Sequence, residues 1–437
     1  MSDTIFALSS APGRAGVAVI RVSGPSAGAC VQTLTERTLP PPRAAALRRL
    51  RDGADQEIDQ ALVLWFPGPA SFSGEDMAEF HVHGGRAVVA SVLAAVAKIK
   101  ACRPAEPGEF TRRAVENGKF DLTQAEALKD LIDAETRSQR VQALDQYSGV
   151  LSTLYEAWRE RLIRACAWAE AEIDFSDEDI PGDLQARSHA EVKGISQEIQ
   201  RHLNDSRRGE LVREGIYLTL IGPPNAGKSS LINALARRDV AIVAETPGTT
   251  RDVLEVKLDL GGFAVVAADT AGLREVADAV ENEGVRRALA RADSSDLVLL
   301  LLDGSARDPF HGLSSQIVAR ASLMVWNKSD LPWPRSREGL QLSLKTGEGF
   351  EQLLSAIQAK VAERLDVPGE APVLTRARHR YALEQALAAL ERSVAASEAE
   401  LRAEDLRLAA RWIGRITGRI DIEELLDVIF RDFCIGK

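Results

Sequence analysis

The glycine-rich segment Gly222–Ser229, with the sequence GPPNAGKS, constrains the fold of this 437-residue chain more than any other feature. It follows the apolar run Ile216–Ile221 and precedes the helix-like segment Ser229–Ala236. Between a strand and a helix, such a loop surrounds phosphate groups with backbone N–H groups, and the helix N-terminus adds its positive end. We expect Lys228 to reach the β and γ phosphates and the Ser229 hydroxyl to bind Mg²⁺. The segment therefore predicts a nucleotide-binding α/β unit, with a turn that binds nothing as the less favoured alternative.

Three further motifs follow in the order that a GTPase requires. Asp269–Gly272 (DTAG) ends a predicted strand, so that its aspartate holds a water on the metal and its glycine senses the γ-phosphate. Asn327–Asp330 (NKSD) ends another strand, and its last carboxylate accepts the N1 and 2-amino protons that guanine has and adenine lacks. Gly248–Thr250 lies between the phosphate loop and these motifs, where a mobile switch places a threonine on Mg²⁺. Together the motifs predict guanine as the base.

Ser343-Leu344-Lys345 stands where many GTPases have a Ser-Ala-Lys contact to the base, although the leucine departs from that pattern. A surface loop is an alternative for these three residues, because short motifs also match by chance. The residues predicted to bind GTP are Asn225, Ala226, Gly227, Lys228, Ser229, Ser230, Ala244, Glu245, Thr246, Pro247, Gly248, Thr249, Thr250, Asp269, Thr270, Ala271, Gly272, Asn327, Lys328, Asp330, Ser343, Leu344 and Lys345.

The position after the Asp-x-x-Gly motif holds Leu273 rather than the glutamine that orients the attacking water in Ras-type enzymes. Arg274 is a candidate arginine finger, but an exposed arginine is more often solvated. The side-chain carbonyl of Asn225, facing backbone carbonyls of Ala244–Thr249, predicts an oxygen cage for a monovalent cation that neutralises charge developing on the phosphates. Glu281 is a candidate to orient water, and an acidic residue favoured by a helix N-terminus is an equal alternative. The predicted catalytic residues are Asn225, Lys228 and Glu281.

Four segments of different character divide the chain. Short strand-like runs such as Val17–Val22 and Ala61–Phe66 predict an α+β domain at the beginning. A capping box at Thr123–Glu126, followed by apolar residues at helical spacing, predicts the start of a helical segment. The predicted boundaries are 1–117 for the α+β domain, 118–210 and 372–437 for two helical segments, and 211–371 for a doubly wound α/β domain inserted between them.

Composition and charge exclude several classes of protein. Hydrophobic residues make up 45% and charged residues 27%, as in soluble globular proteins, and the longest apolar run, Leu297–Leu302, is far too short to span a bilayer. The four cysteines are scattered without a CxxC pair, which fits neither a zinc site nor a disulfide framework and indicates the reducing cytoplasm. The formal net charge of −10 excludes a chain that binds nucleic acid by overall charge alone.

Four segments outside the GTPase motifs resemble the MnmE (TrmE) family of bacterial tRNA-modification GTPases. They are PGRAGVAVIRVSG near the beginning, SFSGEDMAEFHVHGG, PGEFTRRAVENGKFDLTQAEA and the final CIGK, and the resemblance covers essentially the full length. It implies a GcvT-like tetrahydrofolate-binding N-terminal domain, a helical domain built from both sides of a Ras-like P-loop G domain, and a homodimer formed through the N-terminal domain. It also implies that the two G domains meet across the dimer in the transition state, with K⁺ completing each site.

The resemblance also implies roles for individual residues. Glu281 would act on the attacking water, through a second water. Each predicted folate contact is otherwise a charged residue that would be solvated, but a carboxylate suits the guanine-like donors of a pterin and a cation suits its glutamate tail. The implied ligands are Asn225, Ala244, Thr246 and Thr249 for K⁺, Ser229 and Thr250 for Mg²⁺, and Arg21, Glu79, Lys119 and Lys437 for folate.

The activity implied by the resemblance is GTP hydrolysis coupled to installing a carboxymethylaminomethyl-type or aminomethyl group on the wobble uridine of certain tRNAs. The implied partner is the flavoprotein MnmG (GidA), which brings FAD and NADH into a heterotetramer, while 5-formyl- or methylene-tetrahydrofolate supplies one carbon. An RNA-binding GTPase switch in ribosome assembly is the alternative. That class carries a GxxG loop on a basic module, whereas Gly414 and Gly418 have GxxxG spacing in a helical pattern.

Two smaller features have competing interpretations. Cys434 begins the final CIGK, which does not fit a prenylation signal; the family suggests a role in the modification chemistry, and a flexible thiol without a catalytic role is an equal alternative. His81 and His83 lie two residues apart on a predicted strand and suggest a metal pair, but the sequence offers no third ligand nearby, which favours a structural role.

Overall fold

The computed structural model describes residues 3–174, 184–238, 240–242, 255–269, 290, 292–332, 339–365, 373–420, 426, 429–431 and 433–436. The chain forms two compact units, and each is described by itself. Unit 1 comprises Met1–Lys129, Tyr147–Glu160 and Ala410–Lys437, and unit 2 comprises Asp130–Gln146 and Arg161–Ala409.

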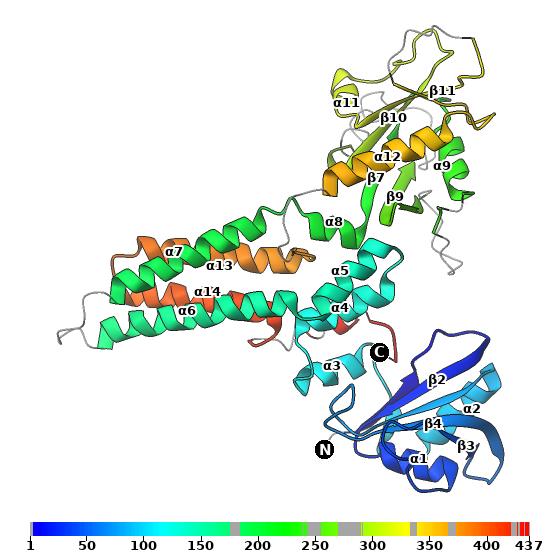
Figure 1. Ribbon diagram of the computed structural model, residues 1–437, viewed down its shortest axis with the longest axis vertical. Coiled ribbons are helices and arrows are strands. Elements are labelled where there is room, and N and C mark those ends of the chain that lie inside the picture. Colours follow the sequence, from blue (N-terminus) through cyan, green and yellow to red (C-terminus); the bar gives the residue numbers. More distant parts are fainter. Residues whose placement is uncertain are drawn as a thin grey trace, which may run out of the picture. The chain divides into compact units, whose positions relative to one another are not determined.

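Unit 1 is built on a six-stranded sheet with the order β3-β4-β5-β2-β1-β6. Figure 1 labels three of its strands, β2, β3 and β4. Neighbouring strands are antiparallel, except that β1 and β6 are parallel. The strands predicted at Val17–Val22 and Ala61–Phe66 are confirmed, since they lie within β2 and β4. The strands are β1 (Thr4–Leu8), β2 (Ala15–Ser23), β3 (Ala46–Arg51), β4 (Glu57–Phe66), β5 (Met77–Gly84) and β6 (Cys102–Pro104).

Helices cover one face of this sheet. Side chains alternate along the strands, so that Ile20, Val22 and Phe80 are buried against α1 (Ala27–Thr35) and α2 (Arg86–Ala97). Residues of the opposite parity include the cross-strand neighbours Leu47 and Leu62, which are 65% and 44% exposed. The sheet therefore has one buried face and one face with exposed apolar side chains.

Helix α4 (Leu122–Asp133) begins earlier than the capping box at Thr123–Glu126 predicted, so that prediction is wrong. The carboxylate of Asp121 accepts a hydrogen bond from the Gln124 N–H at 3.0 Å, and the Gln124 side chain accepts one from the Asp121 N–H at 3.1 Å. These reciprocal bonds form a capping box two residues upstream. The Thr123 hydroxyl instead donates to Asp121 at 2.8 Å, inside the first turn. Helix α3 (Glu109–Glu116) precedes this turn.

Unit 2 contains a second six-stranded sheet with the order β12-β11-β10-β7-β9-β8. Its pairs are parallel except β8 with β9, which are antiparallel. Buried aliphatic residues of the strands pack against α9 (Lys228–Ala236) and α12 (Phe350–Leu365). The strands are β7 (Ile216–Ile221), β8 (Glu255–Leu260), β9 (Phe263–Asp269), β10 (Leu297–Asp303), β11 (Leu323–Asn327) and β12 (Leu340–Gln341), and a short helix, α11 (Ser315–Ala319), precedes β11.

Helices flank this α/β portion in the sequence. The short helix α8 leads directly into β7, so it connects the helical segments to the strand that ends at the phosphate loop. The helices are α5 (Arg137–Tyr147), α6 (Val150–Asp174), α7 (Leu184–Leu203), α8 (Arg208–Glu214), α13 (Ala377–Ala395) and α14 (Ala399–Thr417). The Pro181-Gly182 break predicted between α6 and α7 lies outside the described residues. Within the described residues, no helix is long and apolar enough to cross a membrane.

Candidate guanine-nucleotide site

The phosphate loop leaves the carboxyl end of β7 in a tight bend. A Cβ at Gly222 would lie 2.1 Å from the carbonyl oxygen of Leu301 on β10, so only glycine fits where the loop begins. Asn225 and Gly227 have φ of 63° and 104°, in the left-handed region. The Lys228 ammonium donates to the carbonyl oxygens of Gly222 at 2.8 Å and Pro223 at 3.0 Å. The loop thus curls around the Lys228 side chain at the start of α9.

Asn327 joins the guanine motif to this loop. It ends β11 and is 3% exposed, and its side-chain NH₂ donates to the Ala226 carbonyl oxygen at 2.8 Å. Its side-chain oxygen accepts from the Leu344 N–H at 3.3 Å. Because the parallel strands β7, β10 and β11 end at one edge of the sheet, three segments far apart in sequence converge on this amide.

Asp330 is bound to the segment Ser343–Lys345. The hydroxyl of Ser343, which is buried, donates to the Asp330 carboxylate at 2.8 Å and accepts from the Thr346 N–H at 3.2 Å. The Lys345 ammonium lies 3.9 Å from the second Asp330 oxygen. These contacts, with that of Leu344 to Asn327, attach the segment Ser343–Lys345 to the NKSD motif.

A second cluster of predicted residues lies on the sheet of unit 1. Arg21 of β2 and Glu79 of β5 are cross-strand neighbours, and the guanidinium donates twice to one Glu79 oxygen, at 2.9 and 3.1 Å. The Arg21 guanidinium lies 5.3 Å from the ring centroid of Phe72 and 5.8 Å from that of Phe110. Sheet register therefore pairs these two predicted folate contacts with each other beside aromatic rings.

Lys119 reaches the same region through neighbouring residues. Its ammonium donates to the Pro69 carbonyl oxygen at 2.8 Å, and the next residue, Phe120, has its ring centroid 5.7 Å from that of Phe72. Phe72 therefore lies between the Arg21 guanidinium and the segment that carries Lys119.

Comparison with known proteins decides the family. A family model described as GTP-binding protein TrmE N-terminus matches residues 4–119, and one described as MnmE helical domain matches residues 122–434. The chain belongs to the MnmE family of tRNA modification GTPases. Among relatives named tRNA modification GTPase MnmE, the protein of Paramagnetospirillum magneticum is 54% identical over 100% of both chains, and that of Parvibaculum lavamentivorans is also 54% identical over 100% of both.

A human member extends the comparison beyond bacteria. The mitochondrial subunit of a 5-taurinomethyluridine tRNA synthase from Homo sapiens is 48% identical, over 99% of this chain and 93% of its own length. The chain is thus a multidomain α/β protein of the MnmE family and a GTP-hydrolysing enzyme.

Several residues with predicted roles in this MnmE-family chain lie outside the described residues or are described only in part. Asp269 ends β9, paired in register with Leu220 of β7, so its backbone lies beside the strand that leads to the phosphate loop. The residues outside are Ala244, Glu245, Thr246, Pro247, Gly248, Thr249, Thr250, Thr270, Ala271, Gly272, Glu281 and Lys437, together with Leu273 and Arg274.

The segment before Lys437 is anchored in unit 1. The Ser9 hydroxyl donates to the Gly436 carbonyl oxygen at 2.7 Å. The Gly108 N–H donates to the backbone carbonyl oxygen of Cys434 at 3.3 Å. A Cβ at Gly436 would lie 2.1 Å from the Leu8 carbonyl oxygen. The Cys434 thiol is exposed, while its backbone carbonyl oxygen accepts the hydrogen bond from Gly108.

The histidines on β5 pair with carboxylates. His81 lies 3.1 Å from Glu79, and the Nδ1 atom of His83 lies 2.7 Å from Asp59, whose other oxygen accepts from the His83 N–H. Burial on its own raises the pKa of Asp59, but the hydrogen bonds from His83 and Gln60 hold it below its usual value. Across the described parts of the chain, no group of three or more His, Cys, Asp or Glu side chains is arranged to hold a metal ion.

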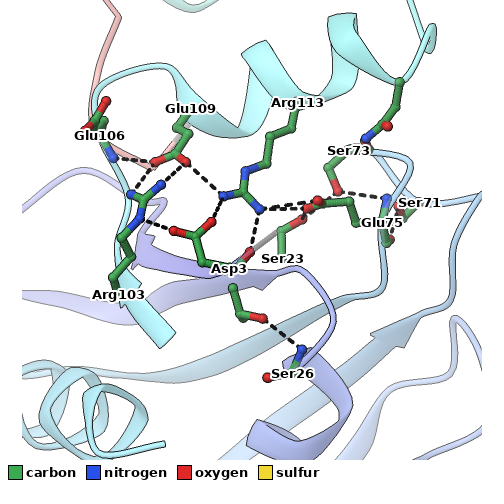
Figure 2. A network of polar contacts seen from close by, with 12 residues as sticks. Asp3, Ser23, Ser26, Ser71, Ser73, Glu75, Arg103, Glu106, Glu109 and Arg113 are labelled. Carbon is green, nitrogen blue, oxygen red and sulfur yellow. Dashed lines mark hydrogen bonds and ion pairs between the residues drawn. The ribbon is translucent and has the colours of Figure 1, made fainter. Parts of the chain in front are cut away.

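An ion-pair network of unit 1 is centred on Arg113 and Arg103 (Figure 2). The Arg113 guanidinium donates to Asp3 at 2.7 Å, to Glu109 at 2.9 Å and to Glu75 at 3.2 Å, and Arg103 also binds Asp3 and Glu109. Burial raises the pKa of Glu109, yet hydrogen bonds from Arg103 and the Glu106 N–H hold it below its usual value. A polar cavity of about 800 Å³ opens beside this network. The network ties the start of β1 to α3 and to the segment around Glu75.

Proposed function

We propose that this chain is a K⁺-dependent GTPase that, with a flavoprotein partner, installs a carboxymethylaminomethyl-type group at the wobble uridine of certain tRNAs. The hydrogen bond from Asn327 to Ala226 carries the proposal, because it brings a guanine-reading motif onto a phosphate loop. The printed names of the relatives support tRNA as the substrate, and that of the human relative supports a modified uridine as the product.

In the proposed GTP site, Asp330 accepts the protons of guanine and Lys228 binds the β and γ phosphates. Ser229 and Thr250 would hold Mg²⁺; Asn225, Ala244, Thr246 and Thr249 would hold K⁺; and Glu281 would orient water. Asn225 lies at a bend of the phosphate loop, with a φ of 63°, and its side-chain carbonyl is the oxygen assigned to K⁺. Bound K⁺ would supply positive charge beside the phosphates where Leu273 replaces the usual glutamine.

In the proposed folate site, Arg21, Glu79, Lys119 and Lys437 hold 5-formyl- or methylene-tetrahydrofolate in a GcvT-like N-terminal domain. The fit rests on chemistry that the described residues supply, namely a half-buried carboxylate for pterin donors, cations for the glutamate tail, and the rings of Phe72 and Phe110 nearby. The bound folate would supply the one-carbon unit.

The proposed assembly is a homodimer that forms a heterotetramer with the flavoprotein MnmG (GidA), the carrier of FAD. The exposed pair Leu47 and Leu62, with Val17 57% exposed on β2, supports a partner surface on the N-terminal sheet. We assign residues 1–117 to the folate domain, 118–210 and 372–437 to the helical domain, and 211–371 to an inserted Ras-like G domain. The free cysteines of the described chain support the cytoplasm as its location.

Reconstitution tests the proposal. The full chain is mixed with the flavoprotein, unmodified tRNA, NADH, tetrahydrofolate donor and GTP, in K⁺ or Na⁺ buffer, and wobble uridine is analysed by mass spectrometry. We expect modified uridine only with GTP and K⁺. Modification that proceeds equally in Na⁺ would contradict the proposed K⁺ site. GTP hydrolysis without any modification in the complete mixture would favour a ribosome-assembly switch.

A further inference from the structure

Lys328, the second residue of the guanine motif, has an unusual backbone for its type. Its φ is 66°, in the left-handed region that residues with a Cβ adopt infrequently. Hydrogen bonds on both sides hold the turn, from the Gly304 N–H to the Asn327 carbonyl oxygen at 2.9 Å and from the Leu331 N–H to that of Lys328 at 3.0 Å. The turn places Lys328 between Asn327, which binds the phosphate loop, and Asp330, which faces Ser343.

The Lys328 side chain is fixed by a residue of the neighbouring strand. Asp303 ends β10, directly opposite Asn327 in register, and one of its carboxylate oxygens lies 2.6 Å from the Lys328 ammonium. The other oxygen accepts from the N–H and the hydroxyl of Ser305, at 2.9 and 2.6 Å. The Asp303 side chain is only 18% exposed. Both oxygens are therefore occupied, and the carboxylate cannot rotate without losing hydrogen bonds.

Electrostatics agrees with this geometry. Burial on its own raises the pKa of Asp303, but the hydrogen bonds from Lys328 and Ser305 hold it below its usual value. Asp303 is therefore charged at neutral pH and pairs with the lysine throughout the physiological range. No sequence motif marks Asp303, because it stands outside the nucleotide motifs and its contact with Lys328 depends on the pairing of β10 with β11.

We propose that Asp303 is a positioning residue for guanine-nucleotide binding, which acts by holding Lys328 in one conformation beside the base-reading Asp330. The inference rests on the proposed GTP site. A free lysine side chain loses much of its rotamer freedom when it becomes ordered, and a lysine already held by Asp303 loses less on binding. Removal of the Asp303 charge is therefore expected to weaken GTP and GDP binding about tenfold, which corresponds to about 1.4 kcal/mol.

The direction of this effect distinguishes positioning from simple charge. GTP and GDP are anions, so removal of a nearby negative charge would by itself strengthen their binding. If Asp303 instead acts by positioning Lys328, removal of its charge weakens nucleotide binding. Asp303→Asn keeps an oxygen for Ser305 but turns an NH₂ group toward the Lys328 ammonium, so it removes the ion pair with little change in shape.

The test compares Asp303→Asn, Lys328→Met and the double variant in the full-length protein, with affinity for fluorescent GTP and GDP and steady-state kinetics as readouts. We expect Asp303→Asn to raise Kd and KM about tenfold with kcat nearly unchanged, and to have no further effect once Lys328 is Met. Asp293→Asn, which removes a more exposed ion pair with Arg320 in the same unit, is the matched control and should bind like the wild type.

Four outcomes separate the hypotheses. Wild-type affinity in Asp303→Asn overturns the inference, as does an equal loss with and without Lys328. Tighter binding by Asp303→Asn shows a charge effect and also overturns it. If the wild-type chain itself binds no guanine nucleotide, the proposed GTP site fails instead, and the inference fails with it. A thermal unfolding curve of each unliganded variant confirms that lost affinity does not reflect lost folding.

Discussion

His202, at the end of α7, makes stability depend on pH at the scale of one residue. Its side chain is buried, and its pKa is lowered to about 4 because burial and the nearby charge of Arg380 together outweigh the opposing effect of Asp205. In the unfolded chain the pKa is about 6.5, so between these values the unfolded chain binds a proton that the folded chain does not. The contribution of neutral His202 to the free energy of unfolding is therefore complete above pH 6.5 and is lost as the pH falls toward 4.

We therefore expect unit 2 to lose about 2 kcal/mol of unfolding free energy through His202 between pH 7 and pH 5. Urea unfolding at the two pH values measures it, with the wild type compared with His202→Asn. The variant is expected to be less stable at pH 7 but to lose about 2 kcal/mol less on acidification. An identical pH dependence in both proteins would contradict a neutral buried imidazole.

Sequence predicts single residues well where the chemistry is local. The phosphate loop and the NKSD motif are contiguous, and their strand and helix flanks are confirmed by β7, α9 and β11. A local sequence pattern does not predict a contact whose partner comes from another strand. The pairing of Arg21 with Glu79 and of Asp303 with Lys328 depends on sheet register, which no local pattern specifies.

At the scale of the element, helix α8 is held in place before it leads into β7. Arg380 of α13 donates to Asp205 at 2.6 Å, to Glu210 at 3.0 Å and to the Leu203 carbonyl oxygen at 2.8 Å. Glu210 is buried and is also bound by Arg207, so removal of Arg380 leaves one of its two carboxylate oxygens without its ion-pair partner. We expect Arg380→Ala to cost about 2 to 3 kcal/mol of unfolding free energy, since breaking a buried ion pair is far costlier than breaking an exposed one.

Arg392→Ala on the same helix is the control for that measurement. Its partner Asp405 and its own side chain are more accessible to water, so its removal is expected to cost at most about 1 kcal/mol. Equal losses in the two variants, measured by chemical denaturation, would show that Arg380 has no special role.

The periodicity of apolar residues predicts the helices, but the sequence offers two capping boxes at the start of α4. Thr123 with Glu126 was the predicted one, and Asp121 with Gln124 is the one that forms. Asp121 prevails, since aspartate is the stronger N-cap residue.

At the scale of the molecule, segments from the two ends of the sequence meet in one unit. Gly436 binds Ser9, and Arg21 and Lys119 belong to the same unit, whereas the nucleotide motifs belong to the other. The sequence predicted a chain of several domains from changes in its texture. It could not predict which distant segments share a core, because that depends on contacts hundreds of residues apart.

This separation predicts that the two ligands respond independently to a change at Lys437. Lys437→Met removes a cation from the proposed folate site, and a charge-assisted hydrogen bond to a carboxylate contributes enough that the Kd for 5-formyl-tetrahydrofolate should rise about tenfold to a hundredfold. The affinity for GTP should stay that of the wild type, because its site uses residues of the other unit. Isothermal titration of both ligands measures this, with the exposed Lys98→Met of unit 1 as the control for a general loss of positive charge. Unchanged folate affinity in Lys437→Met would remove this residue from the site, while a parallel loss of GTP affinity would show that the two sites are coupled.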